Sequence, residues 1–305
     1  MTTCPLCHAG GNTVRQAIQS ALISDLYRRQ FGIDVGYLFA DIERVLFSEC
    51  GACGLFYFSP PVTGDGRFYG KLQQEPWYYL ESKYEYDFVA NLIDRGASVL
   101  DIGSGAGAFA DRLTSGVRYL GLDLNIEATA RSNGADVVNE SIENHALANR
   151  ERYDVVVSFQ SLEHVADPCS FLAAAATCVR PCGMLVIVVP SEDSFVGYAS
   201  NSPLNMPPHH VTRWPDATLR HLAKLLGLNL RFVHHEPLQE MHREWGFSVM
   251  AHALLGHGRH RIDGQASLFG KVRSRTAGVL ARLLQRYLSR EFWPCGHSVI
   301  AVYAK

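Results

Sequence analysis

The sequence has no long apolar segment and no excess of charge of either sign. Apolar runs such as Met184–Val189 are far too short to cross a bilayer, which needs about 20 apolar residues. Lys and Arg number 28 against 30 Asp and Glu, a net charge of -2, so overall charge does not indicate nucleic acid as a partner. The first residues lack the cationic start and apolar run of a signal peptide. We therefore expect a cytoplasmic protein.

Fixed-period repeats and low-complexity tracts are also missing, and 47% of the 305 residues are hydrophobic, as in a globular chain. This length accommodates one large α/β domain and a smaller module. The composition changes along the chain predict five parts. They are an N-terminal cysteine-bearing module (1–61), an aromatic-rich helical cap (62–97), an α/β core (98–236), a helical insertion (237–294) and a final strand of the core (295–305).

Short β-branched runs alternate with helical stretches from Ser98 onward, as a parallel sheet requires. This pattern predicts an open, seven-stranded α/β sheet. The expected strands are Ser98–Ile102, Tyr119–Asp123, Asp136–Val138, Tyr153–Phe159, Met184–Val189, Leu228–His234 and Ser298–Ala304. Among the expected helices are Gly107–Thr114, Ser170–Arg180 and Pro215–Leu226, the last with Gly227 as its stop signal.

A glycine-rich turn follows the first of these strands. Gly103, Gly105 and Gly107 alternate with small residues, which lets the backbone turn sharply with no Cβ to block a ligand. The N–H groups of the next turn can meet a polar or anionic group. Asp123, at the tip of the next strand, is placed to accept both ribose hydroxyls of an adenosine.

Two adenosine cofactors compete for this pattern. The dinucleotide fingerprint is G-x-G-x-x-G and does not require an acid two residues before its first glycine. Here the order is G-x-G-x-G, and Asp101 precedes it. A carboxylate at this position suits the ammonium group of a methionine moiety. The motif therefore favours S-adenosylmethionine over a nicotinamide dinucleotide or a purely structural turn.

Four ordered motifs resemble the class I S-adenosylmethionine-dependent methyltransferases. They are Asp101–Gly107, Asp123, the run Tyr153–Pro168 with its Glu-His-Val after a strand, and Val179–Pro190. The resemblance covers about residues 98 to 235. It implies a Rossmann-like methyltransferase sheet and cofactor contacts from the following residues. They are Asp101, Gly103, Ser104, Gly105, Gly107, Asp123, Leu124, Ser141, Ile142, Phe159 and Gln160.

Two Cys-x-x-Cys pairs lie in the first module, Cys4–Cys7 and Cys50–Cys53. Each pair directs two thiolates toward one point, and two pairs make a closed tetrahedral zinc site. A cytosolic setting disfavours disulfides, and free thiols are the alternative interpretation. We expect a structural zinc ion in a ribbon-like module. The remaining cysteines lack ligand spacing.

The acceptor site is expected in the loop after the fifth strand, because loops at the carboxyl ends of strands face the ligand crevice. This loop contains His209, His210 and Arg213. A neutral imidazole can take a proton from a hydroxyl near pH 7. The alternative interpretation is that both histidines only pack the loop.

The combination of zinc module, methyltransferase core and histidine loop resembles bacterial sugar and polysaccharide methyltransferases. Sugar C-methyltransferases of that group carry a Glu-His pair here, with the His as base. The resemblance implies His210 as base, with His209 in place of the Glu. This replacement favours O-methylation of a saccharide or other small acceptor. An RNA or protein methyltransferase and a non-catalytic cofactor-binding protein are the alternatives.

Further contacts with the acceptor are predicted less directly. Aromatic faces stack on sugar rings, and Tyr78, Tyr79 and Tyr84 precede the core, although such a stripe also suits a hydrophobic core. His164 either contacts the acceptor or orders the turn after the fourth strand. Residues 259–290 are rich in Arg and Lys. They form either a solvated face or a contact with an anionic membrane.

Overall fold

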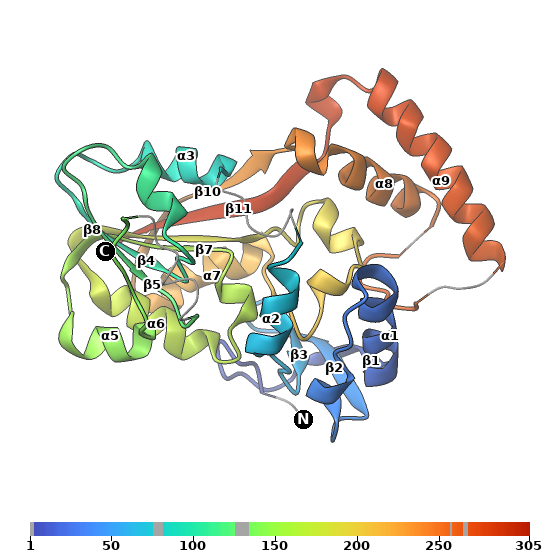
Figure 1. The fold of residues 1–305 in the computed structure, drawn as a ribbon, viewed down its shortest axis with the longest axis horizontal. Coiled ribbons are helices and arrows are strands. Elements are labelled where there is room, and N and C mark those ends of the chain that lie inside the picture. The colour runs from blue at the N-terminus through green and yellow to red at the C-terminus, as the bar shows by residue number, and fades with distance from the viewer. Residues whose placement is uncertain (1–2, 76–81, 126–133, 257, 265–267) are drawn as a thin grey trace.

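The computed structural model describes residues 3–75, 82–125, 134–256, 258–264 and 268–305 (Figure 1). A mixed sheet forms its centre. Its strands are β4 (Ser98–Ile102), β5 (Arg118–Leu122), β6 (Val137–Val138), β7 (Tyr153–Phe159), β8 (Val179–Pro190), β10 (Asn229–Pro237) and β11 (Cys295–Ala304).

The order across this seven-stranded sheet is β10-β11-β8-β7-β4-β5-β6. Neighbouring strands from β8 to β6 are parallel, whereas β11 runs antiparallel to both β8 and β10. The carboxyl ends of β4, β5, β7 and β8 therefore share one edge. This arrangement confirms the predicted Rossmann-like sheet with its last strand supplied from the end of the chain.

Helices cover both faces of the sheet because its central strands are apolar on both sides (Figure 1). Along β8, Leu185 and Ile187 pack in one core cluster, whereas Val186 and Val188 pack in the other. The first cluster contains side chains of α6 (Pro168–Cys178) and α7 (Asp216–Leu226), and Ile142 of α5 (Ile142–Ala148). The second contains side chains of α3 (Tyr84–Ala90).

A second, smaller sheet forms in the N-terminal part. Its strands are β1 (Thr13–Gln19), β2 (Arg44–Glu49), β3 (Phe56–Ser59) and β9 (Thr212–Arg213), in that order and all antiparallel. Two helices accompany it, α1 (Ser20–Phe31) and α2 (Gly66–Leu72). Because β9 belongs to the loop after β8, the loop predicted to hold the acceptor is hydrogen-bonded to the N-terminal sheet.

The helical insertion precedes β11 and contains α8 (Arg243–Leu254) and α9 (Leu268–Tyr287). The two helices project beyond the central sheet (Figure 1). Among the described residues, no helix is long and apolar enough to cross a membrane. Short 3-10 helices complete the elements: η1 (Gly36–Phe39), η2 (Ala108–Arg112), η3 (Leu162–His164), η4 (Phe195–Tyr198), η5 (Pro203–Asn205), η6 (Glu240–His242) and η7 (Arg290–Phe292).

Two predicted helices have different bounds in the structure. The helix expected at Gly107–Thr114 is only the short η2, since Gly107 has a left-handed φ of 83° and Leu113 is already extended. The helix expected at Ser170–Arg180 ends at Cys178, because Val179 and Arg180 begin β8. Sheet pairing with β7 overrides the local helical pattern at this point.

Candidate functional site

The turn after β4 is built on glycines in left-handed backbone conformations. Gly103, Gly105 and Gly107 have φ of 73°, 57° and 83°. The N–H groups of Gly103 and Ser104 donate to the carbonyl oxygen of Leu122, which ties the turn to the end of β5. A Cβ at Gly103 would lie 2.1 Å from Ser161 Oγ. The left-handed backbone conformation of this turn therefore favours glycine, as the sequence predicted.

Asp123 follows β5 and lies against this turn. Its carboxylate accepts the N–H of Gly105 at 2.7 Å and the N–H of Asn125 at 2.7 Å. Leu124, beside it, is 74% exposed. These contacts hold the carboxylate next to the glycine turn, where a ribose would meet it.

Asp101 is the acid inside β4. Its side chain is buried, and one carboxyl oxygen accepts the hydroxyl of Tyr119 at 2.9 Å. The other oxygen, Oδ1, has no hydrogen-bond partner among the described residues. Burial, reinforced by the nearby charge of Asp123, raises the pKa of Asp101 to about 7. A cation is the partner that would satisfy this carboxyl group.

The remaining predicted cofactor residues lie after β6 and at the end of β7. Ser141 caps α5 by accepting the N–H of Asn144, and Ile142 is buried beside it. Phe159 packs in an aromatic cluster at the end of β7. Gln160 has a φ of 50° and donates to Ser298 Oγ at 3.0 Å.

S-adenosylmethionine fits the donors and acceptors of this turn. Its α-ammonium group complements the buried Oδ1 of Asp101, and its ribose hydroxyls complement the carboxylate of Asp123. The N–H groups of a turn with no Cβ can meet its carboxylate.

Three histidine side chains gather after β7 and β8. His164 ends η3, and His209 and His210 lie in the loop before β9. Ring centroids are 4.5 Å apart for His164 and His209, 5.0 Å for His164 and His210, and 4.5 Å for His209 and His210. Burial lowers the pKa of His164 to about 4, and burial with neighbouring imidazoles lowers those of His209 and His210. The rings are therefore neutral near pH 7.

Glu163 lies beside these rings and is fully buried. Its Oε1 is 3.8 Å from His164 Nε2 and 3.9 Å from His210 Nε2. Neither carboxyl oxygen has a hydrogen-bond partner among the described residues. Burial raises the pKa of Glu163 to about 8.

Ser161 connects the glycine turn to this histidine cluster. Its hydroxyl contacts the carbonyl oxygen of Gly103 at 3.4 Å, and its own carbonyl accepts the N–H of His164 at 3.1 Å. The cofactor motif and the histidines therefore belong to one edge of the sheet.

Some buried polar groups near this edge were not predicted. Burial raises the pKa of Glu85 on α3 and raises that of Glu236 on β10 to about 7. Glu236 accepts the N–H of Ser298, and buried His297 has its pKa lowered to about 3. They lie in helix and strand patterns with no motif around them, so the sequence offered no signal for them.

The other predicted acceptor residues lie elsewhere or outside the described residues. Tyr84 hydrogen-bonds His234 Nε2 of β10 at 2.9 Å. The buried Arg213 donates to the carbonyl oxygen of Asn205 and lies over the rings of Phe47 and Phe58. It therefore holds the loop against the N-terminal sheet. Tyr78 and Tyr79 lie outside the described residues.

The four predicted zinc ligands come together. Cys4 and Cys53 have sulfur atoms 3.7 Å apart, and those of Cys7 and Cys50 are 3.6 Å apart. All four sulfur atoms lie within 4.8 Å of one another, and none of the cysteines is in a disulfide. A tetrahedral zinc site with Zn–S bonds of about 2.3 Å has sulfur atoms about 3.8 Å apart. The cluster therefore has the dimensions of such a site.

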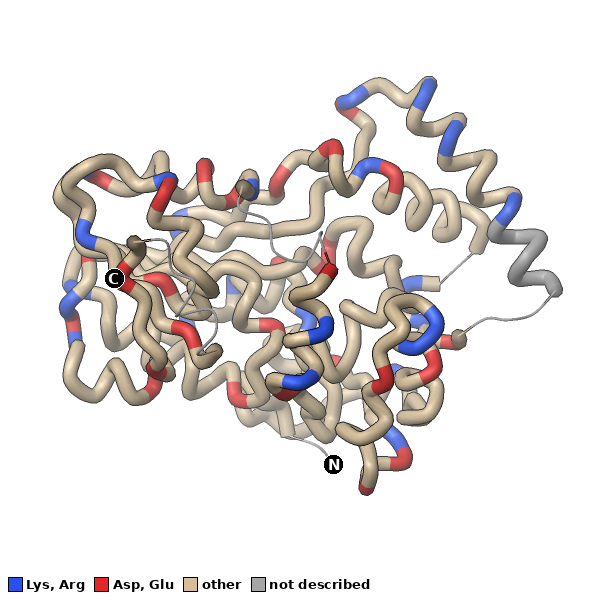
Figure 2. The backbone as a smooth tube through the Cα atoms, in the orientation of Figure 1, with Lys and Arg blue, Asp and Glu red and all other residues tan. Residues whose placement is uncertain are grey.

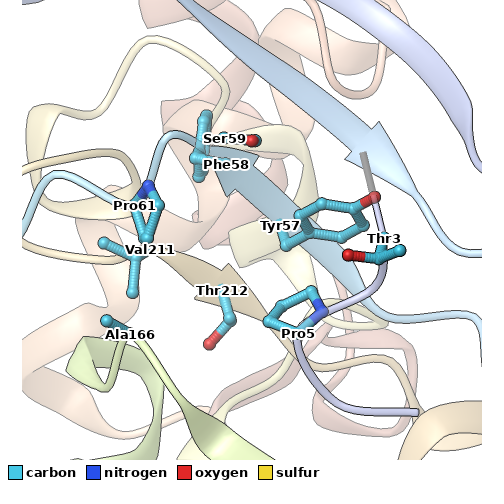
Figure 3. A pocket seen from close by; sticks show the side chains of 9 residues that line it. All are labelled: Thr3, Pro5, Tyr57, Phe58, Ser59, Pro61, Ala166, Val211 and Thr212. Carbon is cyan, nitrogen blue, oxygen red and sulfur yellow. The ribbon is translucent and has the colours of Figure 1, made fainter. Parts of the chain in front are cut away.

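A pocket lies where the N-terminal segment and β3 meet the β9 loop (Figure 3). No charged side chain lines it, and it contains none of the predicted site residues. The lining residues are Thr3, Pro5, Tyr57, Phe58, Ser59, Pro61, Ala166, Val211 and Thr212. We assign no chemistry to it.

The predicted basic segment divides into two parts. Arg259 contacts Glu192 and Asp193, and Arg261 pairs with Asp263, so both have acidic neighbours. In contrast, α9 contains no Asp or Glu in its sequence, and Arg275, Arg282 and Arg286 are spaced along the part of it that is not grey in Figure 2.

Comparison with known proteins identifies the family of the chain. The sequence model of the family described as "Methyltransferase domain" matches residues 77–251, more than half of the chain. The chain therefore belongs to this family and is a class I S-adenosylmethionine-dependent methyltransferase.

Curated relatives match over a shorter segment. The chain is similar to the ubiquinone biosynthesis O-methyltransferase of Serratia proteamaculans, at 40% identity over 95 residues, or 28% of this chain and 39% of that protein. The enzyme of the same name from Salmonella typhimurium is 38% identical over 97 residues, covering 29% and 40%. The matched segment thus spans about two fifths of these relatives.

A solved structure shows the same fold. The S-adenosylmethionine-dependent methyltransferase from Archaeoglobus fulgidus has a TM-score of 0.50 and 20% identity, covering 78% of this chain and all of that one.

Proposed function

We propose that this chain transfers the methyl group of S-adenosylmethionine to a hydroxyl group of a small acceptor, with a saccharide as the first candidate. The observation that carries the proposal is the histidine cluster joined to the glycine turn through Ser161. Neutral, buried imidazoles beside a cofactor site can act on an acceptor proton. The name O-methyltransferase of the curated relatives supports oxygen as the accepting atom.

Each part of the site has a distinct task in this proposal. S-adenosylmethionine, when bound, supplies an electrophilic methyl group on a positively charged sulfur. Asp101 and Asp123 hold the ammonium and ribose groups. His210 or His209 takes the proton of the acceptor hydroxyl. Glu163 Oε1 lies 3.9 Å from His210 Nε2, close enough for a positive charge on this ring to favour the carboxylate form of Glu163. Positioning by the loop supplies much of the acceleration.

The saccharide acceptor rests on the sequence resemblance and on the polar character of the site. The experiment is mass spectrometry of sugar nucleotides, oligosaccharides and catechols incubated with the protein and cofactor. We expect one saccharide class to gain a methyl group. Methylated catechols without methylated saccharides would overturn the sugar assignment. Cofactor binding with no methylated product in any class would favour a non-catalytic binding protein.

Variants test the histidines directly. We expect His209→Ala combined with His210→Ala to keep cofactor affinity and to lower turnover about 100-fold or more. His221→Ala on α7 is the matched control, because this histidine lies outside the cluster. Unchanged turnover in the double variant would remove both histidines from the reaction.

We also propose that Cys4, Cys7, Cys50 and Cys53 bind one structural zinc ion. The sulfur spacing supports this, and so does the packing of the cysteines in the same core cluster as α6 and α7. Thr218 of α7 donates its hydroxyl to the carbonyl oxygen of Cys53 at 2.9 Å. With four thiolates the ion has no open position, so its role is to hold the N-terminal part on the core.

We propose further that α9 contacts an anionic membrane surface. Val279, Leu283 and Tyr287 form an exposed apolar stripe at four-residue spacing, flanked by Arg282 and Arg286. Such a face suits the interface of a bilayer. Flotation with vesicles containing anionic lipid should recover the protein, and Leu283→Glu should abolish recovery. If the protein binds neither anionic nor neutral vesicles at low salt, the proposed membrane contact of α9 is contradicted.

A further inference from the structure

The histidine cluster and Glu163 form a set of metal-ligand atoms inside the protein. One ring nitrogen each of His164, His209 and His210 lies within 4.8 Å of the others. Glu163 Oε1 is 3.8 Å and 3.9 Å from the Nε2 atoms of His164 and His210. Side chains from two separate loops, after β7 and after β8, thus converge on one point.

Glu163 is the unusual member of this set. Its side chain is only 2% exposed, and neither carboxyl oxygen accepts a hydrogen bond from a described residue. An unpaired buried carboxylate is costly, and such groups in proteins are paired with cations or coordinate metals. The nearest ring nitrogens are His164 Nε2 and His210 Nε2, at 3.8 Å and 3.9 Å from Glu163 Oε1. A bound cation would satisfy the carboxylate and the ring lone pairs together.

We propose that His164, His209, His210 and Glu163 bind one first-row divalent metal ion such as Fe²⁺, Co²⁺, Ni²⁺ or Zn²⁺. Imidazole nitrogen suits these ions, whereas Mg²⁺ and Ca²⁺ prefer ligand sets made only of oxygen. Ligand atoms bound at about 2.1 Å to one ion lie about 3 to 3.4 Å apart. Binding would therefore need the donor atoms, now within 4.8 Å of one another in the three histidines, to move closer together.

Backbone contacts orient two of the rings for this task. His164 Nδ1 donates to the carbonyl oxygen of His209 at 2.6 Å, and His209 Nδ1 donates to that of Leu204 at 3.0 Å. Metal-binding histidines characteristically donate their other ring N–H to a carbonyl or carboxylate, which fixes the tautomer. In both rings the contact directs the proton to Nδ1 and leaves Nε2 as the ligand atom.

A metal ion at this site would change how the histidine cluster activates the acceptor. This part of the inference rests on the proposed methyl transfer. A six-coordinate ion such as Fe²⁺, Co²⁺ or Ni²⁺, held by three nitrogens and one carboxylate, would keep two positions for oxygen ligands. A bound ion would lower the pKa of an acceptor hydroxyl, so that its proton could pass to water. His209 and His210 would then act by holding the ion, instead of taking the proton directly. An acceptor with two adjacent oxygens, such as a vicinal diol, would occupy two positions.

The test counts metal ions on the full-length protein. Protein stripped with a chelator is reloaded with Co²⁺, and the bound metal is measured by elemental analysis and visible absorption. We expect wild type to bind one Co²⁺ more per chain than the variant with His164→Ala, His209→Ala and His210→Ala. His221→Ala should match wild type. Glu163→Gln, which keeps the shape of the side chain, should weaken the binding of this Co²⁺ ion at least tenfold. Because thiolate-bound Co²⁺ absorbs more strongly at short wavelength, the spectrum separates the cysteine site from this one.

Equal Co²⁺ content in wild type and the triple variant, with both proteins still binding S-adenosylmethionine, would overturn the metal site. Methyl transfer by the metal-free chain would overturn the activating role of the ion and leave the proposed function standing. Conversely, an extra Co²⁺ with no methyl transfer to any acceptor would support the site and contradict the proposed function.

Discussion

His164 Nδ1 donates a hydrogen bond of 2.6 Å to the carbonyl oxygen of His209, which joins the turn after β7 to the loop after β8. The N–H of Val211 donates to the carbonyl oxygen of Glu163 at 2.9 Å and strengthens the same connection. The two loops therefore act as one unit. A ligand group held by either loop meets side chains of both.

The glycine turn gives a first prediction. Gly103→Ala places a Cβ 2.1 Å from Ser161 Oγ at a φ of 73°. Strain at a left-handed residue costs about 1 kcal/mol, and the clash displaces the turn. We expect at least about a tenfold loss of S-adenosylmethionine affinity by calorimetry. Gly66→Ala, at a helical position with open space around it, should bind normally. Equal affinities for the two variants would refute the assigned role of Gly103.

Asp101 predicts a pH dependence of cofactor binding. Its pKa of about 7 means that the free protein carries a protonated carboxyl at lower pH, whereas the ammonium group of the cofactor favours the carboxylate. Affinity should therefore fall as pH drops below 7, by up to about tenfold per unit. Calorimetry in buffers of different ionisation enthalpy should detect the released proton. The Asp101→Asn variant should bind the cofactor weakly, and its affinity should not depend on pH in this range. A wild-type affinity that stays constant between about pH 5.5 and pH 8 would count against this assignment.

The raised pKa of Asp101 also makes the stability of the protein depend on pH. The sign of this dependence is opposite to that of a salt-bridged carboxylate, whose pKa is lowered by folding. Between about pH 4 and pH 7 the folded chain holds a proton on Asp101 that the unfolded chain has lost. The contribution of Asp101 to the free energy of unfolding therefore decreases as pH rises through this range. Urea unfolding of wild type and Asp101→Asn should show a smaller decrease for the variant.

Loss of a cysteine ligand should loosen the N-terminal part. Cys4→Ser removes one thiolate from a cluster that packs on the core, so we expect loss of zinc and a fall in Tm of about 5 °C or more. Cys295→Ser, at an exposed cysteine outside the cluster, should change neither quantity. A Cys4→Ser variant with full zinc content and unchanged Tm would contradict a four-cysteine site.

The sheet could be predicted from the sequence because its signals are local. Alternating β-branched runs locate β4, β7 and β8, and each glycine or acid of the cofactor turn follows a strand directly. The two cysteine pairs were also recognisable from their spacing. The elements between them, β1, α1 and β2, were not predicted. The N-terminal part therefore contains strands and a helix between its two cysteine pairs.

Long-range pairing was not predictable in the same way. Thr212 and Arg213 have no strand pattern of their own, and they become β9 only because Phe56 and Tyr57 of β3 pair with them. Arg213 is for this reason packed against aromatic rings, although its loop position had suggested contact with the acceptor. The joining of His164 to the histidines 45 residues later likewise depends on the fold of the whole chain.

The most direct test of this account is a calorimetric titration of the purified protein with S-adenosylmethionine, compared with its Asp123→Ala variant. We predict one binding site, weakened about 30-fold or more in the variant, because two charge-assisted hydrogen bonds to the ribose are lost. Asp111→Ala, at an exposed acid on η2, should bind like wild type. Absence of binding by the wild-type protein, or equal binding by Asp123→Ala, would contradict the cofactor site at the end of β4 and β5.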